Sequence, residues 1–346
     1  TATSYTVESE TITLQNPTKS GYTFVWMNGS DEVTQITKGS TGNITLMGKW
    51  TAISYEITYV LPDVVTNPNT VTSYTVETEP ITLQDFSHDD YTFDGWFDAE
   101  TGGNKVISIP KGSTGNKTLY AQCTWKWIGT KNPTTAKAVG DIVFSDGSAT
   151  AYTSGLTLTD EQKSKAVAVI FYVGTDCSND STSRTLGVGL AQNQSGLAWC
   201  LGSADACNVN ITTIQESDKD GSDNLEQIED FDGVNDTATE ANYPAFYFAK
   251  NYASQTGSNV SGTDYEDGWY LPAKAELQKI YDILSTVNKE LAACGGTTFE
   301  TTGVYWSSSQ YASGGDNAFY LSFYDGGWCY NAKYNTSYVC AVRAFN

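Results

Sequence analysis

The last residues of the chain hold the side chains whose types favour molecular recognition. The stretch 325–345 places Trp328, Tyr330, Tyr334 and Tyr338 among Gly, Asn, Ser and Thr, with few aliphatic residues. A core strand is richer in Val and Ile, and a disordered tail holds fewer aromatics. Tyrosine and tryptophan offer large contact area at low entropic cost, and small polar side chains supply adaptable hydrogen bonds. This composition predicts a binding surface that needs no covalent chemistry.

The residues that could carry covalent or metal chemistry are few and scattered. The seven cysteines include no pair with Cys-x-x-Cys spacing, which disfavours a zinc site. Cys200 and Cys207 are close enough in sequence to form a disulfide, and two buried thiols are an equal alternative. The single histidine, His88, lies in the turn-like run SHDD without a second His or Cys beside it. The sequence therefore offers no candidate for histidine-based catalysis and predicts that the protein is not an enzyme.

One acidic segment, residues 218–223 (DKDGSD), has enough carboxylates to attract Ca²⁺. Its glycine stands at the wrong position for an EF-hand loop. A solvated acidic loop is therefore the favoured interpretation, and calcium binding is the alternative that stays open. No other cofactor is predicted.

The net charge of −21 is spread unevenly, with −1 on residues 1–52, −6 on 53–127 and −14 on the rest. Such a surface argues against nucleic acid as a partner, because phosphates need clustered Lys and Arg. It also argues against anionic membranes, and the acidity is explained most simply by the solubility of a secreted protein. The sequence holds no apolar run of 18 residues, so no membrane insertion is predicted for this segment.

The length of 346 residues predicts two or three domains. The chain opens with TATSYTV, which is not a signal peptide and is typical of a domain interior. We therefore expect that the protein was trimmed upstream of this segment and that its signal and anchor lie outside it.

The first 126 residues contain an internal repeat, which indicates tandem small domains. Three segments recur at an offset of 69 residues and a fourth at 73, so the second copy carries an insertion of four residues near 98–103. The pairs are 4–8 (SYTVE) with 73–77, 12–15 (ITLQ) with 81–84, 22–24 (YTF) with 91–93, and 38–43 (KGSTGN) with 111–116. Each segment predicts a short strand or a Gly-rich turn, and residues 55–61 predict an additional opening strand for which the first copy has no equivalent.

The pattern GYTF-x-GW…GSTGN-x-TLYAxW resembles the Listeria–Bacteroides repeat, the internalin B-type repeat of bacterial surface proteins, best over residues 56–126. The chain departs from that pattern at Val25, where the family has Gly, and at 123–125, where the family reaches its Trp sooner. The resemblance implies two small β-grasp-like modules, at 1–52 (truncated) and 53–127, that serve as a spacer. The alternative is that the repeats bind a receptor themselves.

Beyond a Pro/Thr-rich boundary at 127–138, the pattern changes to that of a third domain at 128–346. Strands are predicted at 139–144 and 167–173, and a helix with a Thr cap begins at Thr159. Further helices are predicted at 238–253, with Pro244 early in it, and at 272–293, where one face carries Leu277, Ile280, Tyr281, Leu284 and Val287. Gly-, Ser- and Tyr-rich strands follow, so the order of helices before antiparallel strands predicts an α+β domain.

Three motifs within residues 139–346 carry a second resemblance: GWYLPAKAEL at 268–277, YWSSS at 305–309 and VRAF at 342–345. They resemble the C-type lectin fold of the formylglycine-generating-enzyme type and, more narrowly, the variable proteins of diversity-generating retroelements. In that family a reverse transcriptase introduces errors at adenines of AAC-type codons near the 3′ end of the gene. Such errors reach Tyr, Asp, Ser, Thr, Gly, Ala and Cys but not Lys, Gln, Glu, Met or Trp.

Residues 311–338 hold mainly this reachable set, whereas Lys333 and Trp328 lie outside it and are expected to be fixed or to come from another codon. The alternation of Phe319, Leu321 and Phe323 with polar or aromatic neighbours over 318–324 predicts one core face and one exposed face. The resemblance implies that the exposed, variable positions bind the ligand. These are Tyr311, Ser313, Gly315, Asp316, Asn317, Tyr320, Ser322, Tyr324, Asp325, Trp328, Tyr330, Asn331, Tyr334, Asn335, Thr336, Ser337 and Tyr338.

The sequence thus predicts a bacterial surface or secreted protein in which two spacers precede a ligand-binding head, with a protein or an exposed glycan as partner. An invariant adhesin, or a plain bundle of strands whose tyrosines pack on one another, are the alternatives. A formylglycine-generating enzyme would use a C-terminal cysteine pair, but Cys329 lies among the variable positions and Cys340 stands where related sequences often have Arg. A calcium lectin would show Glu-Pro-Asn or Gln-Pro-Asp with Trp-Asn-Asp, which do not occur. The sequence fixes neither the ligand nor the oligomeric state.

Overall fold

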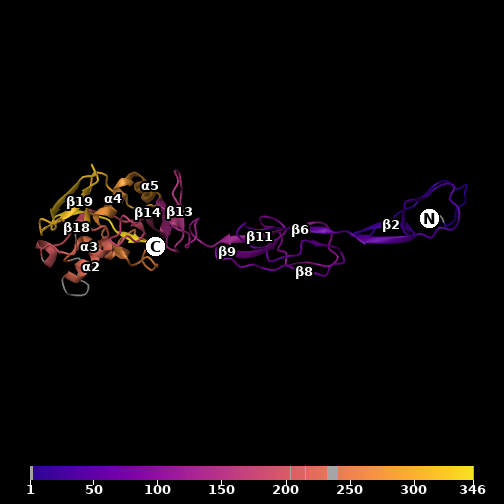
Figure 1. Cartoon of the computed structure of the whole chain (residues 1–346), viewed down its shortest axis with the longest axis horizontal. Coiled ribbons are helices and arrows are strands. Elements are labelled where there is room, and N and C mark those ends of the chain that lie inside the picture. The colour runs from indigo at the N-terminus through magenta and orange to yellow at the C-terminus, as the bar shows by residue number, and fades with distance from the viewer. Residues whose placement is uncertain (1–2, 203, 215, 232–240, 346) are drawn as a thin grey trace. The chain divides into compact units, whose positions relative to one another are not determined.

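The computed structural model describes residues 3–202, 204–214, 216–231 and 241–345, and it divides the chain into two units between Lys126 and Trp127 (Figure 1). The sequence placed this boundary one residue later, after Trp127. Among the described residues, no helix combines the length and the apolar character that crossing a bilayer requires.

The second repeat is built on a four-stranded sheet with the order β7-β6-β11-β9. Strand β6 runs parallel to β11, whereas β9 is antiparallel to β11 and β7 is antiparallel to β6. The apolar side chains of these strands meet in a small core around Trp96. The strands of this repeat are β6 (Tyr55–Val60), β7 (Ser73–Tyr74), β8 (Ile81–Thr82), β9 (Tyr91–Phe97), β10 (Ser108–Ile109) and β11 (Lys117–Trp125).

The first repeat has a three-stranded sheet, β3-β2-β5, and a separate pair, β1-β4. The segment SYTVE was predicted as a strand in both copies. It is not a strand in the first copy. In the second copy only Ser73–Tyr74 forms a strand, and this strand pairs with β6. The strands are β1 (Ile12–Thr13), β2 (Tyr22–Asn28), β3 (Asp31–Val33), β4 (Gln35–Ile36) and β5 (Met47–Ala52).

The C-terminal unit contains two sheets. The first has the order β13-β12-β14-β15-β22-β17 and is antiparallel throughout. Its centre is β14, whose residues 166–172 are all buried, as the apolar run predicted. The strands are β12 (Asp141–Phe144), β13 (Ala149–Ala151), β14 (Ala166–Gly174), β15 (Arg184–Gly189), β17 (Trp269–Tyr270) and β22 (Val342–Ala344).

The second sheet has the order β16-β21-β18-β19-β20 and carries the tyrosine-rich segment. Its pairs are antiparallel except for β18 with β21, which are parallel. The strand predicted over 318–324 ends earlier, at Ser322, because Phe323 and Tyr324 enter a turn. The strands are β16 (Asn193–Ala198), β18 (Val304–Gln310), β19 (Asn317–Ser322), β20 (Trp328–Ala332) and β21 (Thr336–Val339).

The helices are α1 (Asp160–Lys165), α2 (Gly221–Phe231), α3 (Pro244–Lys250), α4 (Lys274–Asp282) and α5 (Leu284–Cys294), with short 3₁₀ turns η1 (Asp205–Asn208) and η2 (Tyr252–Ser254). The predicted Thr159 cap is present as a capping box with Gln162. Part of the helix predicted at 238–253 lies outside the described residues. Strands β12 to β16 precede α2 to α5, so the order is more mixed than the helices-first pattern that was predicted.

The single helix predicted over 272–293 is instead two helices. Ile283, with φ −122° and ψ 23°, leaves the helical conformation and separates α4 from α5. Leu277, Ile280 and Val287 are buried as predicted, whereas Tyr281 and Leu284 beside the break are only half-buried. The break therefore turns part of the predicted apolar face toward the surface.

The segment predicted as a linker, 127–138, is fastened to the C-terminal unit. The amide of Ile128 donates to Asp146 Oδ2 at 2.8 Å, and Lys131 exchanges backbone hydrogen bonds with Ala149. The Lys131 ammonium also pairs with the buried Asp141 carboxylate at 2.6 Å. Most of this segment therefore belongs to the C-terminal fold.

Candidate binding face of the C-terminal domain

The register of β19 and β20 sorts the predicted site residues onto two faces of one sheet. Phe319 lies opposite Tyr330 and Leu321 opposite Trp328, whereas Tyr320 lies opposite Cys329. Directly opposed residues of antiparallel strands share a face, and successive residues alternate between faces. Phe319, Trp328 and Tyr330 are therefore on one side, and Tyr320 with Cys329 on the other.

The first side is an aromatic platform, formed by Tyr311, Phe319, Trp328 and Tyr330. The rings of Tyr311 and Tyr330 stack with centroids 4.0 Å apart and planes 5° apart, and both contact the edge or face of Phe319. Phe319 is buried beneath them at 5% exposure, and its ring also meets Trp328. Tyrosine and tryptophan carry polar atoms on large rigid rings, so the platform offers both apolar area and hydrogen bonds.

Helix α4 supports the platform from below. The Lys274 ammonium lies 3.7 Å from the centroid of the Phe319 ring and 5.3 Å from that of Trp328, and it also pairs with Glu216 at 3.2 Å. The indole Nε1 of Trp328 donates to Gln278 Oε1 at 2.7 Å. These contacts hold Trp328 half-buried and in one orientation, so it belongs to the rigid base of the platform more than to its exposed rim.

The opposite side of the sheet packs on β18 around Tyr320, whereas Cys329 on the same side is exposed. Tyr320 is half-buried against Trp306, with ring centroids 6.0 Å apart. The indole of Trp306 donates to the Leu197 carbonyl at 2.9 Å, which fixes this side to β16. Beyond Tyr320, Asn335 Nδ2 donates to Asn331 Oδ1 at 2.7 Å, so the two amides orient each other.

Exposure distinguishes three tyrosines of this segment from all others in the chain. The chain has 22 tyrosines, all among the described residues, and three of them are exposed. These are Tyr324 at 77%, Tyr330 at 51% and Tyr334 at 56%. A tyrosine left in water gains nothing for the fold, so three within eleven residues form a surface that is available for contact.

Two predicted site residues are corrected by the structure. Ser337 is 4% exposed, because β21 lies between β16 and β18 and turns this side chain inward. Gly315 has no room for a side chain, since a Cβ there would lie 2.9 Å from the carbonyl oxygen of Asn208. Neither position can vary freely or contact a ligand through a side chain.

The remaining predicted residues lie on β19 and β21 or in the loops between the strands. Ser313, Asp316, Asp325 and Thr336 are exposed, and Asn317 and Ser322 are half-buried. Tyr338 is also half-buried, and its ring packs against Tyr305 with centroids 5.4 Å apart. The structure therefore brings the predicted residues to one sheet and its loops but not to one continuous face.

Lys333, which was expected to be fixed, is fully buried within this segment. Its ammonium donates to the carbonyl oxygens of Ala206, Val209 and Gly315 at 2.8–2.9 Å and to the side-chain oxygen of Gln310. Burial lowers the pKa of Lys333 to about 8. A single side chain thus joins the loop before β19 to η1 and to β18, and it holds these segments together.

The residues 190–343, which include this whole face, match the model of the Lcl C-terminal domain. Residues 1–49 and 55–122 match the Listeria-Bacteroides repeat domain. The chain joins Listeria-Bacteroides repeats to an Lcl C-terminal domain. Both resemblances drawn from the sequence are confirmed at this level, and the descriptions of the two domains name no enzyme.

A curated relative, Internalin H of Listeria monocytogenes, is 38% identical over 114 residues, which are 31% of this chain. The aligned part is 20% of that relative's length, so the chain corresponds to about a fifth of it. Among solved structures, a fimbrial protein from Bacteroides ovatus is 14% identical with a TM-score of 0.45, over 90% of this chain and 75% of the other.

Sequence reasoning missed the residues that the Lcl domain supplies from outside the tyrosine-rich segment. Lys274 and Gln278 come from α4, and their signal was the motif at 268–277 that was used only to recognise the family. The same motif supplies Glu276, which is fully buried and accepts hydrogen bonds from the amides of Ala273 and Gly221 at 2.8 and 3.0 Å. Glu276 also meets Arg184 at 3.2 Å, so it fixes the start of α4 and hence the platform above it.

The other candidate sites of the sequence have structural roles. Asp220 is buried and pairs with Arg184, so the acidic segment is part of the Glu276 network and is not simply a solvated loop. Among the described residues, no three His, Cys, Asp or Glu side chains are grouped to hold a metal ion. The seven cysteines form no disulfide, and Cys329 is exposed whereas Cys340 is fully buried. Nδ1 of His88 accepts a hydrogen bond from the Asp90 amide at 3.1 Å within its turn.

Proposed function

We propose that the Lcl C-terminal domain is a ligand-binding head and that its tyrosine-rich face binds a protein or an exposed glycan without catalysis or a cofactor. The observation that carries the proposal is the exposure of Tyr324, Tyr330 and Tyr334 alone among 22 tyrosines. Binding energy at interfaces is concentrated in a few aromatic and Arg side chains, and these three are exposed on this face.

The rigidity of the base supports the same proposal. Tyr330 is stacked on Tyr311, and Trp328 is hydrogen-bonded to Gln278, so both have lost conformational freedom before any ligand arrives. A preorganised surface binds more tightly because less side-chain entropy is lost in the complex. Asp316, Asn331 and Asn335 would add polar selectivity at the rim.

We further propose that the head has the C-type lectin fold and that a retroelement diversifies its face, as in the variable proteins it resembles. Lys333, which was expected to be fixed, is buried beneath loops rich in Tyr, Ser, Gly and Asn. This separation of a buried residue outside the variable set from exposed residues within it supports the proposal. An invariant adhesin is the alternative. It would lack, near its gene, an adenine-altered copy of the codons for 305–345 beside a reverse transcriptase.

The two repeats would act as β-grasp-like spacers on a bacterial surface or in a secreted protein. The repeat match and the similarity to a protein named Internalin H support this location, and the parallel pairing of β6 with β11 supports the module type. The net charge of −21 disfavours nucleic acid as the partner.

The test compares four versions of the full chain in a pull-down from the surfaces of neighbouring bacteria and host cells. One carries Tyr324→Ala, Tyr330→Ala and Tyr334→Ala, and its matched control carries Val139→Ala, Val173→Ala and Leu201→Ala, three exposed apolar residues of the same domain. The tyrosine variant should lose a partner that the control and the native chain keep. Exchanging residues 311–338 for the same segment of a sibling protein should change the partner. Capture of one partner by every version would place recognition elsewhere.

A further inference from the structure

The C-terminal domain holds a groove where α4 and α5 meet. Its volume is about 1020 Å³, which is comparable with the upper end of the range of about 300–1,000 Å³ for small-ligand sites. Ile283 lies in one wall, and the interruption of the helix there leaves Tyr281 and Leu284 half-buried beside it. The rest of the lining comes from the first turn of α5, the segment before β18 and the turn after β19.

The floor of the groove is aromatic and rigid. The rings of Tyr281 and Phe323 lie with their centroids 5.6 Å apart, and Phe323 is 3% exposed. The Phe323 amide donates to the Gly303 carbonyl at 2.9 Å, which ties the turn after β19 to the segment before β18. Gly326, at φ 73°, lies so close to the Tyr281 ring that a Cβ there would be 2.6 Å from Cε1. The turn that carries Tyr324 is therefore held against α4.

The rim of the groove carries polar and aromatic groups that the fold does not use. Tyr324 is 77% exposed, and within the described part of the chain it makes no ring contact and no side-chain hydrogen bond. Four exposed hydroxyl side chains also lack a hydrogen-bond partner among the described residues: Ser285, Thr286, Thr301 and Thr302. Each hydroxyl can donate one hydrogen bond and accept others, so the groove combines a free aromatic face with several polar groups.

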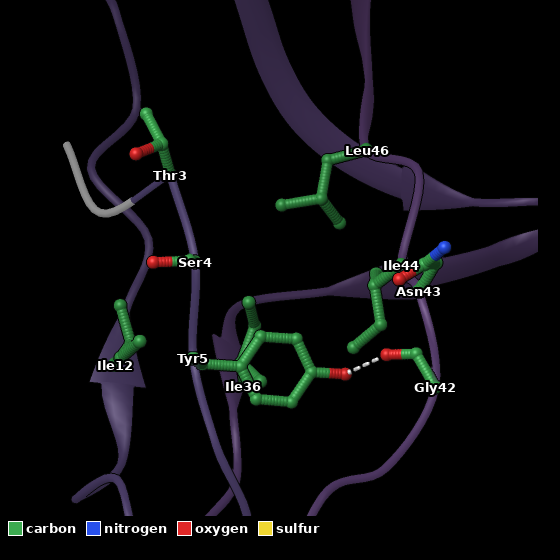
Figure 2. Close-up of a pocket in the computed structure, with 9 residues that line it drawn as sticks. All are labelled: Thr3, Ser4, Tyr5, Ile12, Ile36, Gly42, Asn43, Ile44 and Leu46. Carbon is green, nitrogen blue, oxygen red and sulfur yellow. Dashed lines mark hydrogen bonds between the residues drawn. The ribbon is translucent and has the colours of Figure 1, made fainter.

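Two other cavities lack this combination. In the first repeat, a cavity of about 390 Å³ has one aromatic ring in its lining, that of Tyr5, whose hydroxyl already donates to the Gly42 carbonyl at 2.6 Å (Figure 2). In the C-terminal domain, a cavity of about 350 Å³ near η2 is lined by Ser and Thr hydroxyls and by no aromatic side chain. Of the three, only the groove at the helix break offers both stacking and free hydroxyls.

The surroundings favour a neutral ligand. Asp282 is the one charged side chain among the described residues that line the groove, and its Oδ1 accepts from Gln278 Nε2 at 2.9 Å. An anionic ligand would therefore find no counter-charge there, and the net charge of −14 on residues 128–346 would repel it. A peptide could not pair with the neighbouring strands, because β18 and β19 are interior strands of their sheet.

We propose that this groove binds a neutral oligosaccharide, with one sugar ring stacked on Tyr324 and its hydroxyl groups hydrogen-bonded to the Ser and Thr side chains of the rim. A pyranose ring presents a face of C–H bonds that packs on an aromatic ring, and its hydroxyl groups both donate and accept. The groove shares Tyr324 with the tyrosine-rich face, but it is a second site and does not rest on the function proposed for that face.

The test applies the full chain to an array of neutral oligosaccharides of glucose, galactose, mannose and N-acetylhexosamines, together with sialylated and sulfated forms of the same structures. We expect binding to at least one neutral oligosaccharide and weaker binding to its charged form. Titration calorimetry with the soluble form of that oligosaccharide then compares the variants with the native chain.

Tyr324→Ala should weaken binding of the oligosaccharide roughly 10-fold or more, whereas Tyr324→Phe keeps the ring and should retain most of the affinity. Thr302→Val replaces a hydroxyl by a methyl group of similar size and should weaken binding about 2- to 10-fold. Its matched control is Thr157→Val, at an exposed threonine of the same domain that does not line the groove, and it should have no effect.

A double variant, Tyr330→Ala with Tyr334→Ala, separates the groove from the tyrosine-rich face. Neither residue lines the groove, so this variant should keep the oligosaccharide even where it loses the partner captured by the face. Failure of every neutral oligosaccharide to bind, a preference for the charged forms, or native affinity in Tyr324→Ala would overturn the groove proposal and leave that for the face intact. Loss of the oligosaccharide in the double variant would also overturn it, because the site would then lie on the face.

Discussion

The ring of Tyr311 lies flat on the ring of Tyr330, with centroids 4.0 Å apart. One tyrosine follows the end of β18 and the other belongs to β20, so the stack joins the two edges of β19 over Phe319. It makes an exposed side chain rigid without burying it. This combination distinguishes a prepared contact surface from a flexible one.

Tyr311→Ala and Tyr330→Ala should show a coupling free energy of unfolding of about 0.5–1.5 kcal/mol, because the double variant loses the stack only once. Denaturant unfolding of both single variants and the double variant measures it. Tyr324→Ala paired with Tyr330→Ala is the control and should be additive. Additivity in the first pair would mean that the stack contributes nothing.

Tyr324→Ala and Tyr334→Ala should change the free energy of unfolding by less than about 0.5 kcal/mol, since both side chains are exposed. Trp306→Ala and Phe323→Ala remove buried rings and should destabilise by about 3–5 kcal/mol. Tyr320→Ala should fall between the two groups because this ring is half-buried. Equal losses in all five would make the tyrosines part of the core.

Lys333→Met should destabilise the domain by about 3 kcal/mol or more, because several buried oxygens then lack a donor. The exposed Lys289→Met is the matched control and should have little effect. Thermal unfolding measures the stability, and amide exchange of residues 312–316 reports whether the loop is released. A stable variant with a protected loop would show that the ammonium is dispensable.

Glu290 predicts a pH dependence of stability. It is 1% exposed, its two carboxylate oxygens have no hydrogen-bond partner among the described residues, and Asp141 is nearby. Burial and that neighbouring charge raise the pKa of Glu290 from 4.5 to about 7. The folded protein therefore holds the Glu290 proton more tightly than the unfolded chain does. The protonated carboxyl stabilises the fold below pH 4.5, and this stabilisation is lost as the pH rises through 7.

Glu290→Gln should remove this dependence. The variant should gain about 3 kcal/mol relative to the native chain between pH 4.5 and 8. Urea unfolding at several pH values gives the difference, and Glu226→Gln, at an exposed position on α2, is the control. A constant difference across that range would contradict the raised pKa.

The anchored segment at 127–138 predicts where the chain can be divided. A fragment that begins at Trp127 should fold and melt close to the intact C-terminal domain. A fragment that begins at Val139 loses the Lys131–Asp141 ion pair, leaving a buried carboxylate without its ammonium, and should melt well below it. Calorimetry of the two fragments decides, and equal melting temperatures would restore the view that this segment is a linker.

The sequence predicted the elements whose signals are local. The repeats, the Thr159 cap and the apolar run of β14 all appear in their own residues. The break at Ile283 could not be predicted, because no Gly or Pro interrupts 273–293 and the apolar spacing continues across it. The break therefore has no local signal in the sequence.

The site was predicted by composition, and composition does not show which face is covered. Tyr320 and Tyr330 have the same chemistry, but Tyr320 packs on Trp306 while Tyr330 remains exposed. The contribution of Lys274 and Gln278 depends on α4 lying across β19 and β20, which is a contact between segments about 45–55 residues apart. Ser337 was predicted as a site residue for the same reason, because composition does not show that its side chain turns inward.

The hairpin of β19 and β20 limits how this face can change between related proteins. Phe319 remains opposite Tyr330 only while the turn at 323–327 keeps its length. Inserting or deleting one residue in either strand would exchange inward and outward side chains along the rest of it. Gene copies that differ by single-base substitutions keep the strand lengths, so each residue stays on its own face of the sheet. A copying process that inserted or deleted codons would disrupt the domain with its first error.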